Sequence, residues 1–102
     1  MLLRDKDHKL LMVLAKKTIK TPCEIWAYGS RVDGSAHEAS DLDLVIRSHD
    51  LKPLHISELQ AFKEAIQISN IPILVQVLDW ARIPEVFHES ILKGYAILKP
   101  LG

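Results

Sequence analysis

Residues 26–44 read WAYGSRVDGSAHEASDLDL and contain two short motifs, GS at 29–30 and DLD at 41–43, separated by a polar loop. Residues 24–28, mostly apolar after Glu24, predict a short strand that ends at the glycine, and residues 42–47 predict a second strand. Glycine lets the chain turn tightly and lets a ligand approach the backbone. The serine that follows has a hydroxyl and a main-chain amide at an expected helix start, an arrangement typical of phosphate binding.

The second motif predicts a metal site. Asp41 and Asp43 are two residues apart on the second strand, so both side chains point to the same face, and the leucines at 42 and 44 point to the other. Two carboxylates side by side repel each other unless a cation lies between them. Mg²⁺ prefers such oxygen ligands and is commonly held by one or two carboxylates together with substrate phosphates. We therefore expect the two acids to bind magnesium beside a phosphate held at the glycine–serine pair.

The rest of the chain alternates between helical and extended patterns. Further helices are predicted at about 3–19, 56–69 and 84–93, a short one near residue 30, and further strands at 73–78 and 95–98. The third strand is nearly continuous in apolar residues, which predicts that both of its faces are covered. Together these elements indicate an α/β or α+β fold, a small mixed sheet flanked by helices, in one domain of residues 1–102.

Composition narrows the class of protein. Hydrophobic residues make up 48% and charged residues 25%, which is typical of a globular chain. The 13 basic residues equal the 13 acidic ones, so we expect no strong non-specific binding to nucleic acid. The only cysteine is Cys23, which excludes an intrachain disulfide. Charges near the N-terminus and short apolar runs predict neither a signal peptide nor a membrane span, and hence a cytoplasmic protein.

The order Gly-Ser, a loop with arginine and glycine, then Ser-Asp-x-Asp resembles the nucleotidyltransferase superfamily related to DNA polymerase β. The WAYGSR context and the length resemble its minimal nucleotidyltransferases, and the resemblance covers nearly the whole chain. It implies a polymerase β palm-like fold and Mg²⁺-dependent transfer of a nucleoside monophosphate from ATP or another triphosphate to a hydroxyl. Gly29 and Ser30 would hold phosphates, Asp41 and Asp43 the metal. Arg31 would contact phosphate or pair with a nearby acid.

One position departs from the family pattern. The family has a third carboxylate on the following strand, and counting back from Leu78-Asp79-Trp80 places it at Gln76. An amide is neutral and cannot act as a base, so we expect nucleotide binding to survive and transfer to be slow. Gln76 as a hydrogen-bonded core amide is the alternative. Asp79 is three residues further on and points to the opposite face of a regular strand, so we expect it to be structural.

The resemblance also implies a partner. Minimal members of the family often form the smaller half of a two-gene unit with a helical protein of the HEPN type, and a homo-oligomer is the other expected assembly. The alternative function is therefore a non-catalytic, nucleotide-binding antitoxin or regulatory partner. A third hypothesis is a structural subunit that has lost nucleotide binding. For Trp26 and Trp80 we expect packing against the sheet, with base stacking as the alternative.

Overall fold

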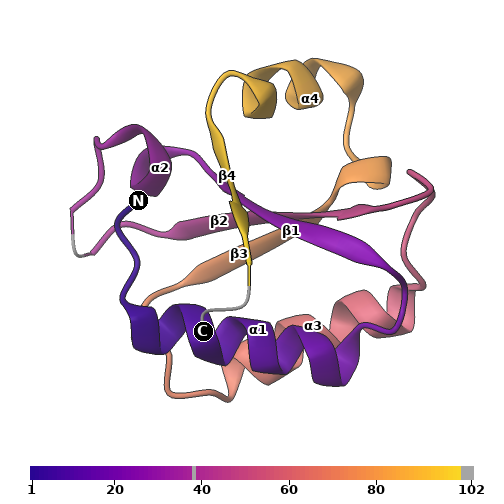
Figure 1. The fold of residues 1–102 in the computed structure, drawn as a ribbon, viewed down its shortest axis with the longest axis horizontal. Helices are drawn as coiled ribbons and strands as arrows, with labels where there is room; N and C mark the ends of the chain where they lie inside the picture. Colours follow the sequence, from indigo (N-terminus) through magenta and orange to yellow (C-terminus); the bar gives the residue numbers. More distant parts are fainter. Residues whose placement is uncertain (38, 100–102) are drawn as a thin grey trace.

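The computed structural model describes residues 1–37 and 39–99. Its centre is a four-stranded sheet with the strand order β3-β2-β1-β4 (Figure 1). β1 (Cys23–Tyr28) pairs antiparallel with both β2 (Leu42–Ser48) and β4 (Tyr95–Leu98), whereas β2 pairs parallel with β3 (Val75–Asp79). The predicted small mixed sheet is confirmed.

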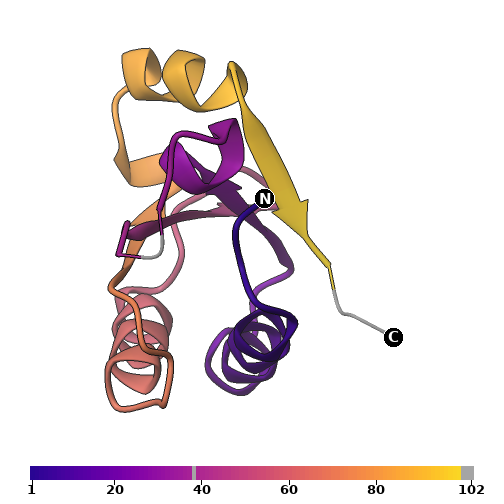
Figure 2. The same cartoon turned by 90° about the vertical axis from the view of Figure 1, so that its left-hand side faces the viewer.

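The helices lie on both sides of this sheet. α1 (Asp5–Thr18) and α3 (Ile56–Gln67) run along one face, and α2 (Ser30–Asp33) and α4 (Glu85–Leu92) lie on the opposite side (Figures 1 and 2). A short 3₁₀ helix, η1 (Trp80–Arg82), follows β3 directly. Within the two described ranges, no helix has the length and apolar character that crossing a membrane requires.

The main core lies between the sheet and the α1–α3 layer. Leu42, Leu44 and Ile46 on β2 are each 0% exposed, as is Phe62 on α3. Their alternation on β2 matches the expectation that these residues point away from the two aspartates. Complete burial of one such side chain contributes about 1.5–3 kcal/mol. The core face of β2 therefore fixes which way Asp41 and Asp43 point.

A smaller cluster lies beneath α4 on the other face. Trp26 stacks on Tyr95 with ring centroids 4.2 Å apart and meets Trp80 edge-on at 5.3 Å. The two tryptophans are only 5% and 9% exposed, so the packing interpretation is confirmed. His88 on α4 is half-buried and stacks on Trp80, with ring centroids 3.8 Å apart. Spacing alone could not show this contact, because β3 and η1 bring the two rings together.

The third strand differs from the prediction in extent and burial. It begins at Val75 rather than residue 73, and the Leu74 carbonyl before it already accepts a hydrogen bond from Leu42 N–H at 2.9 Å. The prediction that both faces are covered is wrong, because the side chains of β3 alternate between buried and solvent-accessible positions. Val77 is buried toward α3, whereas Gln76 on the other face is exposed to solvent.

Candidate functional site

The two aspartates lie where β2 begins. Asp41 immediately precedes β2, and Asp43 is its second residue. Both are partly exposed, on the face of the sheet opposite the α1–α3 layer. Burial raises the pKa of the Asp43 carboxyl, and the negative charge of Asp41 raises it further. The two acids therefore form an anionic pair whose charge a bound cation would neutralise.

Gln76 completes this cluster from the neighbouring strand. It is the parallel-sheet partner of Asp43, and its Nε2 donates a hydrogen bond to Asp41 Oδ2 at 3.1 Å. Because its side chain is exposed, it is not a core amide. The structure thus brings Gln76 together with Asp41 and Asp43.

Asp79 lies elsewhere, on the buried side of β3. It is 3% exposed and accepts hydrogen bonds from Leu54 N–H at 2.9 Å and Ala81 N–H at 3.1 Å, and it pairs with Arg82 at 3.1 Å. These contacts fix the start of η1 and the loop before α3. Asp79 is structural, as expected from its spacing to Gln76.

Gly29 brings the backbone against the acid pair. It has φ 81° and ψ −153° as the residue that precedes α2, and its carbonyl accepts hydrogen bonds from Val32 and Asp33 N–H at 3.0 Å each. A Cβ at this position would lie 2.8 Å from Asp43 Oδ2, closer than atoms of this kind approach. Ser30 begins α2 and is partly exposed. Glycine is therefore needed here both for its conformation and for its contact with Asp43.

Arg31 holds the polar loop rather than extending into solvent. It is 5% exposed, and it donates hydrogen bonds to the carbonyl of Ser40 at 2.9 Å and to that of Leu2 at 2.8 Å. Leu2 N–H in turn donates to the Arg31 carbonyl at 2.9 Å. The side chain thereby connects the chain's first residues to the loop that leads into Asp41.

Asp33, at the end of α2, accepts two hydrogen bonds from Ser35, at 2.8 Å from its amide and 2.6 Å from its hydroxyl.

Two aromatic residues next to the acid pair, Tyr28 and Phe87, were not predicted from the sequence as part of the site. Tyr28 is the antiparallel partner of Asp43, and its ring meets that of Phe87 on α4 edge-on, with centroids 6.3 Å apart. Burial and then the charge of Asp43 raise the pKa of Tyr28 to about 12. The position of Tyr28 immediately before Gly29 was the available signal, whereas nothing local marked Phe87.

The donor set fits a hard divalent cation. The carboxylates of Asp41 and Asp43 provide oxygen, the ligand that Mg²⁺ prefers. In the described part of the chain, no group of three His, Cys, Asp or Glu residues is arranged to hold a metal. An ion at Asp41 and Asp43 would therefore take its remaining ligands from water or from a bound phosphate.

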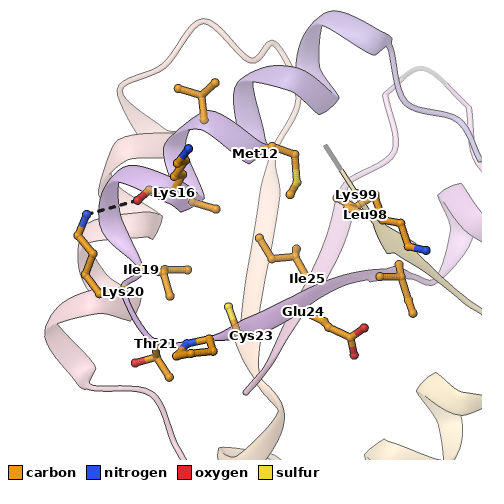
Figure 3. Close-up of a pocket in the computed structure, with 14 residues that line it drawn as sticks. Met12, Lys16, Ile19, Lys20, Thr21, Cys23, Glu24, Ile25, Leu98 and Lys99 are labelled. Atoms are coloured by element: carbon orange, nitrogen blue, oxygen red, sulfur yellow. Dashed lines mark hydrogen bonds between the residues drawn. The ribbon is translucent and has the colours of Figure 1, made fainter. Parts of the chain in front are cut away.

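A separate groove lies on the opposite side of the molecule. It has a volume of about 740 Å³ and runs between α1 and the β1–β4 edge, with Met12, Ile19 and Ile25 among its apolar lining (Figure 3). Lys16, Lys20 and Lys99 also line it. None of the residues that line this groove belongs to the acid cluster, so it is not part of the site described above.

Comparison with known proteins agrees with this geometry. The family model described as polymerase beta, nucleotidyltransferase, matches residues 9–100. The chain belongs to this nucleotidyltransferase family. The resemblance to its minimal members is thereby confirmed.

Two individual proteins are similar to this member of the family. The probable protein adenylyltransferase MntA of Haemophilus influenzae is 44% identical over 75 residues, which cover 74% of this chain and 64% of the relative. The chain therefore matches less than two thirds of that relative's length. A solved structure, the crystal structure of a toxin–antitoxin with AMP-PNP, superposes with a TM-score of 0.73 over 93% of this chain and 74% of its own. At 18% identity, that likeness establishes the shared fold.

Proposed function

We propose that this chain binds ATP, or another nucleoside triphosphate, with Mg²⁺ and transfers the nucleoside monophosphate to a hydroxyl of a protein. Gly29 and Ser30 would hold the phosphates, and Asp41 and Asp43 the metal. The observation that supports this proposal is the proximity of Gly29 to Asp43, because a Cβ at position 29 would lie 2.8 Å from Asp43 Oδ2 and the glycine–serine turn therefore adjoins the acid pair. The name of the similar protein, a probable protein adenylyltransferase, supports ATP and a protein acceptor.

The proposed reaction exchanges one phosphorus–oxygen bond for another. The acceptor oxygen bonds to the α-phosphorus, the bond from that phosphorus to the bridging oxygen breaks, and pyrophosphate leaves with the electron pair. Bound Mg²⁺ supplies charge neutralisation and lowers the pKa of the attacking hydroxyl. The hydroxyl proton passes to solvent water, because Gln76, being a neutral amide, cannot take it. This chain therefore binds nucleotide well and transfers it slowly.

Arg31 enters this proposal as the residue that fixes the loop. Its hydrogen bonds to the Leu2 and Ser40 carbonyls place the residue just before Asp41. These contacts support a role in holding the geometry of the acid pair over direct binding of phosphate. Replacement by lysine would lose the fork of donors that reaches both carbonyls.

The substitution Gln76→Asp tests the slow transfer directly. Restoring a carboxylate beside Asp43 should raise transfer of label from α-labelled ATP to an acceptor by about tenfold or more, since a positioned base contributes at least that much. Gln60→Asp is the matched control, because it adds the same charge at an exposed position on α3. Equal transfer rates for the native chain and Gln76→Asp would contradict the role given to Gln76.

A nucleotide-binding antitoxin is the second candidate function. The side-chain amide of Gln76 donates a hydrogen bond to Asp41, which favours a fixed nucleotide-binding site over catalytic transfer of the nucleotide. The description of the structural neighbour as a toxin–antitoxin with AMP-PNP supports a protein partner, which we propose to be a helical toxin of the HEPN type. Co-purification of the chain with the product of its neighbouring gene, together with no label transfer by the native chain or by Gln76→Asp, would favour this function over the enzyme. Light scattering on the chain alone tests the alternative of a homo-oligomer.

A further inference from the structure

Tyr28 and Phe87 form an aromatic pair immediately beside the acid cluster. Tyr28 lies opposite Asp43 in the β1–β2 register, and residues opposite each other in an antiparallel pair have Cβ atoms about 4.5–5.5 Å apart on the same face. Phe87 approaches from α4 at an interplanar angle of 89°. Figure 1 shows α2 and α4 on the same side of the sheet. Tyr28 is the strand partner of Asp43 and contacts Phe87 of α4, so the pair adjoins the acid cluster.

Phe87 remains exposed to solvent although its ring contacts Tyr28. It is 41% exposed, whereas Ile91 on the same helix is 1% exposed and anchors α4 to the sheet. Trp26 and Trp80 nearby are buried against each other and against other rings. A single exposed apolar residue is common. Phe87 differs because its exposed ring adjoins Tyr28, whose strand partner is Asp43.

We propose that Tyr28 and Phe87 form the surface on which the nucleobase stacks, an inference that rests on the proposed nucleotide site. In the proposed pose the terminal phosphates lie at Gly29 and Ser30, and the α-phosphate lies near the acid pair. The ribose joins the α-phosphate to the base, so the base would lie about the length of one ribose from Asp43. Stacking on aromatic rings uses the π-face of the base rather than its hydrogen-bonding edge. The pair therefore favours purine over pyrimidine nucleotides through ring area and discriminates weakly between ATP and GTP.

Inorganic tripolyphosphate has the phosphates of ATP without a base. Comparing the two ligands therefore tests the stacking surface separately from the phosphate and metal site. We would titrate Mg²⁺–ATP and Mg²⁺–tripolyphosphate into the native chain, Phe87→Ala and Phe87→Leu. Both variants should weaken ATP binding about fivefold or more and leave tripolyphosphate unchanged. Phe87→Leu keeps an apolar side chain on α4, so that any loss of folding in the alanine variant does not obscure the result.

Val86→Ala is the matched control, since Val86 is 71% exposed on the same helix. Unchanged ATP affinity in both Phe87 variants would overturn the stacking surface while leaving the phosphate and metal site intact. An equal loss of ATP and tripolyphosphate affinity would also overturn it, because the ring would then act through the fold of the site. If the native chain binds neither ligand, the proposed function itself fails.

Discussion

Gly29 combines two requirements in one residue, a positive φ and the absence of a Cβ against Asp43. Only the first requirement could be predicted from the sequence, through the abrupt end of an apolar strand at a glycine. The second depends on β2 returning alongside β1. The same limit applies to Arg31, whose position in the motif was evident but whose partner Leu2 is 29 residues away.

Gly29→Ala should destabilise the fold by roughly 1–2 kcal/mol, because alanine at φ 81° is strained and its methyl group pushes against Asp43. It should also abolish Mg²⁺-dependent ATP binding. Urea unfolding and calorimetry measure the two effects. Gly94→Ala is the control, since a Cβ there meets nothing within 4 Å. Normal ATP affinity in Gly29→Ala would show that the close contact with Asp43 is unimportant.

Asp43→Asn should separate stability from binding. The neutral amide removes the desolvation of the carboxylate and its repulsion by Asp41, the two causes that raise the pKa of Asp43. The metal-free protein should therefore become more stable, by less than about 1 kcal/mol because the site is partly exposed. Mg²⁺-dependent binding should be lost. A variant that is less stable than the native chain without metal would mean that the carboxylate has a structural role.

At the scale of elements, Glu58 on α3 fixes the turn between α1 and β1. Its carboxylate accepts hydrogen bonds from Lys20 N–H at 2.7 Å, from Thr21 N–H at 3.2 Å and from the Thr21 hydroxyl at 2.8 Å. Desolvation acts in the opposite direction, but these hydrogen bonds together lower the pKa of Glu58 below its ordinary 4.5. The folded chain therefore favours the ionised form more than the unfolded chain does.

The contribution of Glu58 to stability should be fully present above about pH 4.5 and disappear as the pH falls below that value. Glu58→Gln should cost about 0.5–1 kcal/mol at pH 7, since the group is partly exposed and its hydrogen bonds are partly screened by solvent. The difference between the variant and the native chain should shrink in urea titrations at pH 4 and below. A difference independent of pH would mean that packing, rather than the charge, holds the turn.

Most elements were predictable because their signals are local. The strand that ends at Tyr28, the helix between Pro84 and Gly94 and the strand at residues 95–98 lie where periodicity and helix-end residues placed them. β3 was placed less well, since an apolar run does not show which of its residues pair. Its first hydrogen bond is made with Leu42 at the start of β2, a partner remote in sequence, and the exposure of Gln76 depends on how the rest of the chain covers the sheet.

At the scale of the whole molecule, the strand order places the site. β1 lies between β2 and β4 although β4 is last in the sequence, and the parallel β2–β3 pair requires the crossover through α3. This order brings Tyr28, Asp43 and Gln76 side by side on one face. The aspartates and the glycine–serine turn could be predicted from residue spacing. The aromatic residues beside them could not, because α4 meets β1 only in the folded chain.

A calorimetric titration of ATP into the full chain, with and without Mg²⁺, tests the nucleotide site most directly. Asp41→Asn serves as the matched variant, since it keeps the shape of the side chain and removes one charge of the pair. We expect binding to the native chain that requires Mg²⁺ and is lost in Asp41→Asn. Binding that is independent of Mg²⁺, or equal in the variant, or absent from the native chain, would contradict a metal–nucleotide site at Gly29, Ser30, Asp41 and Asp43.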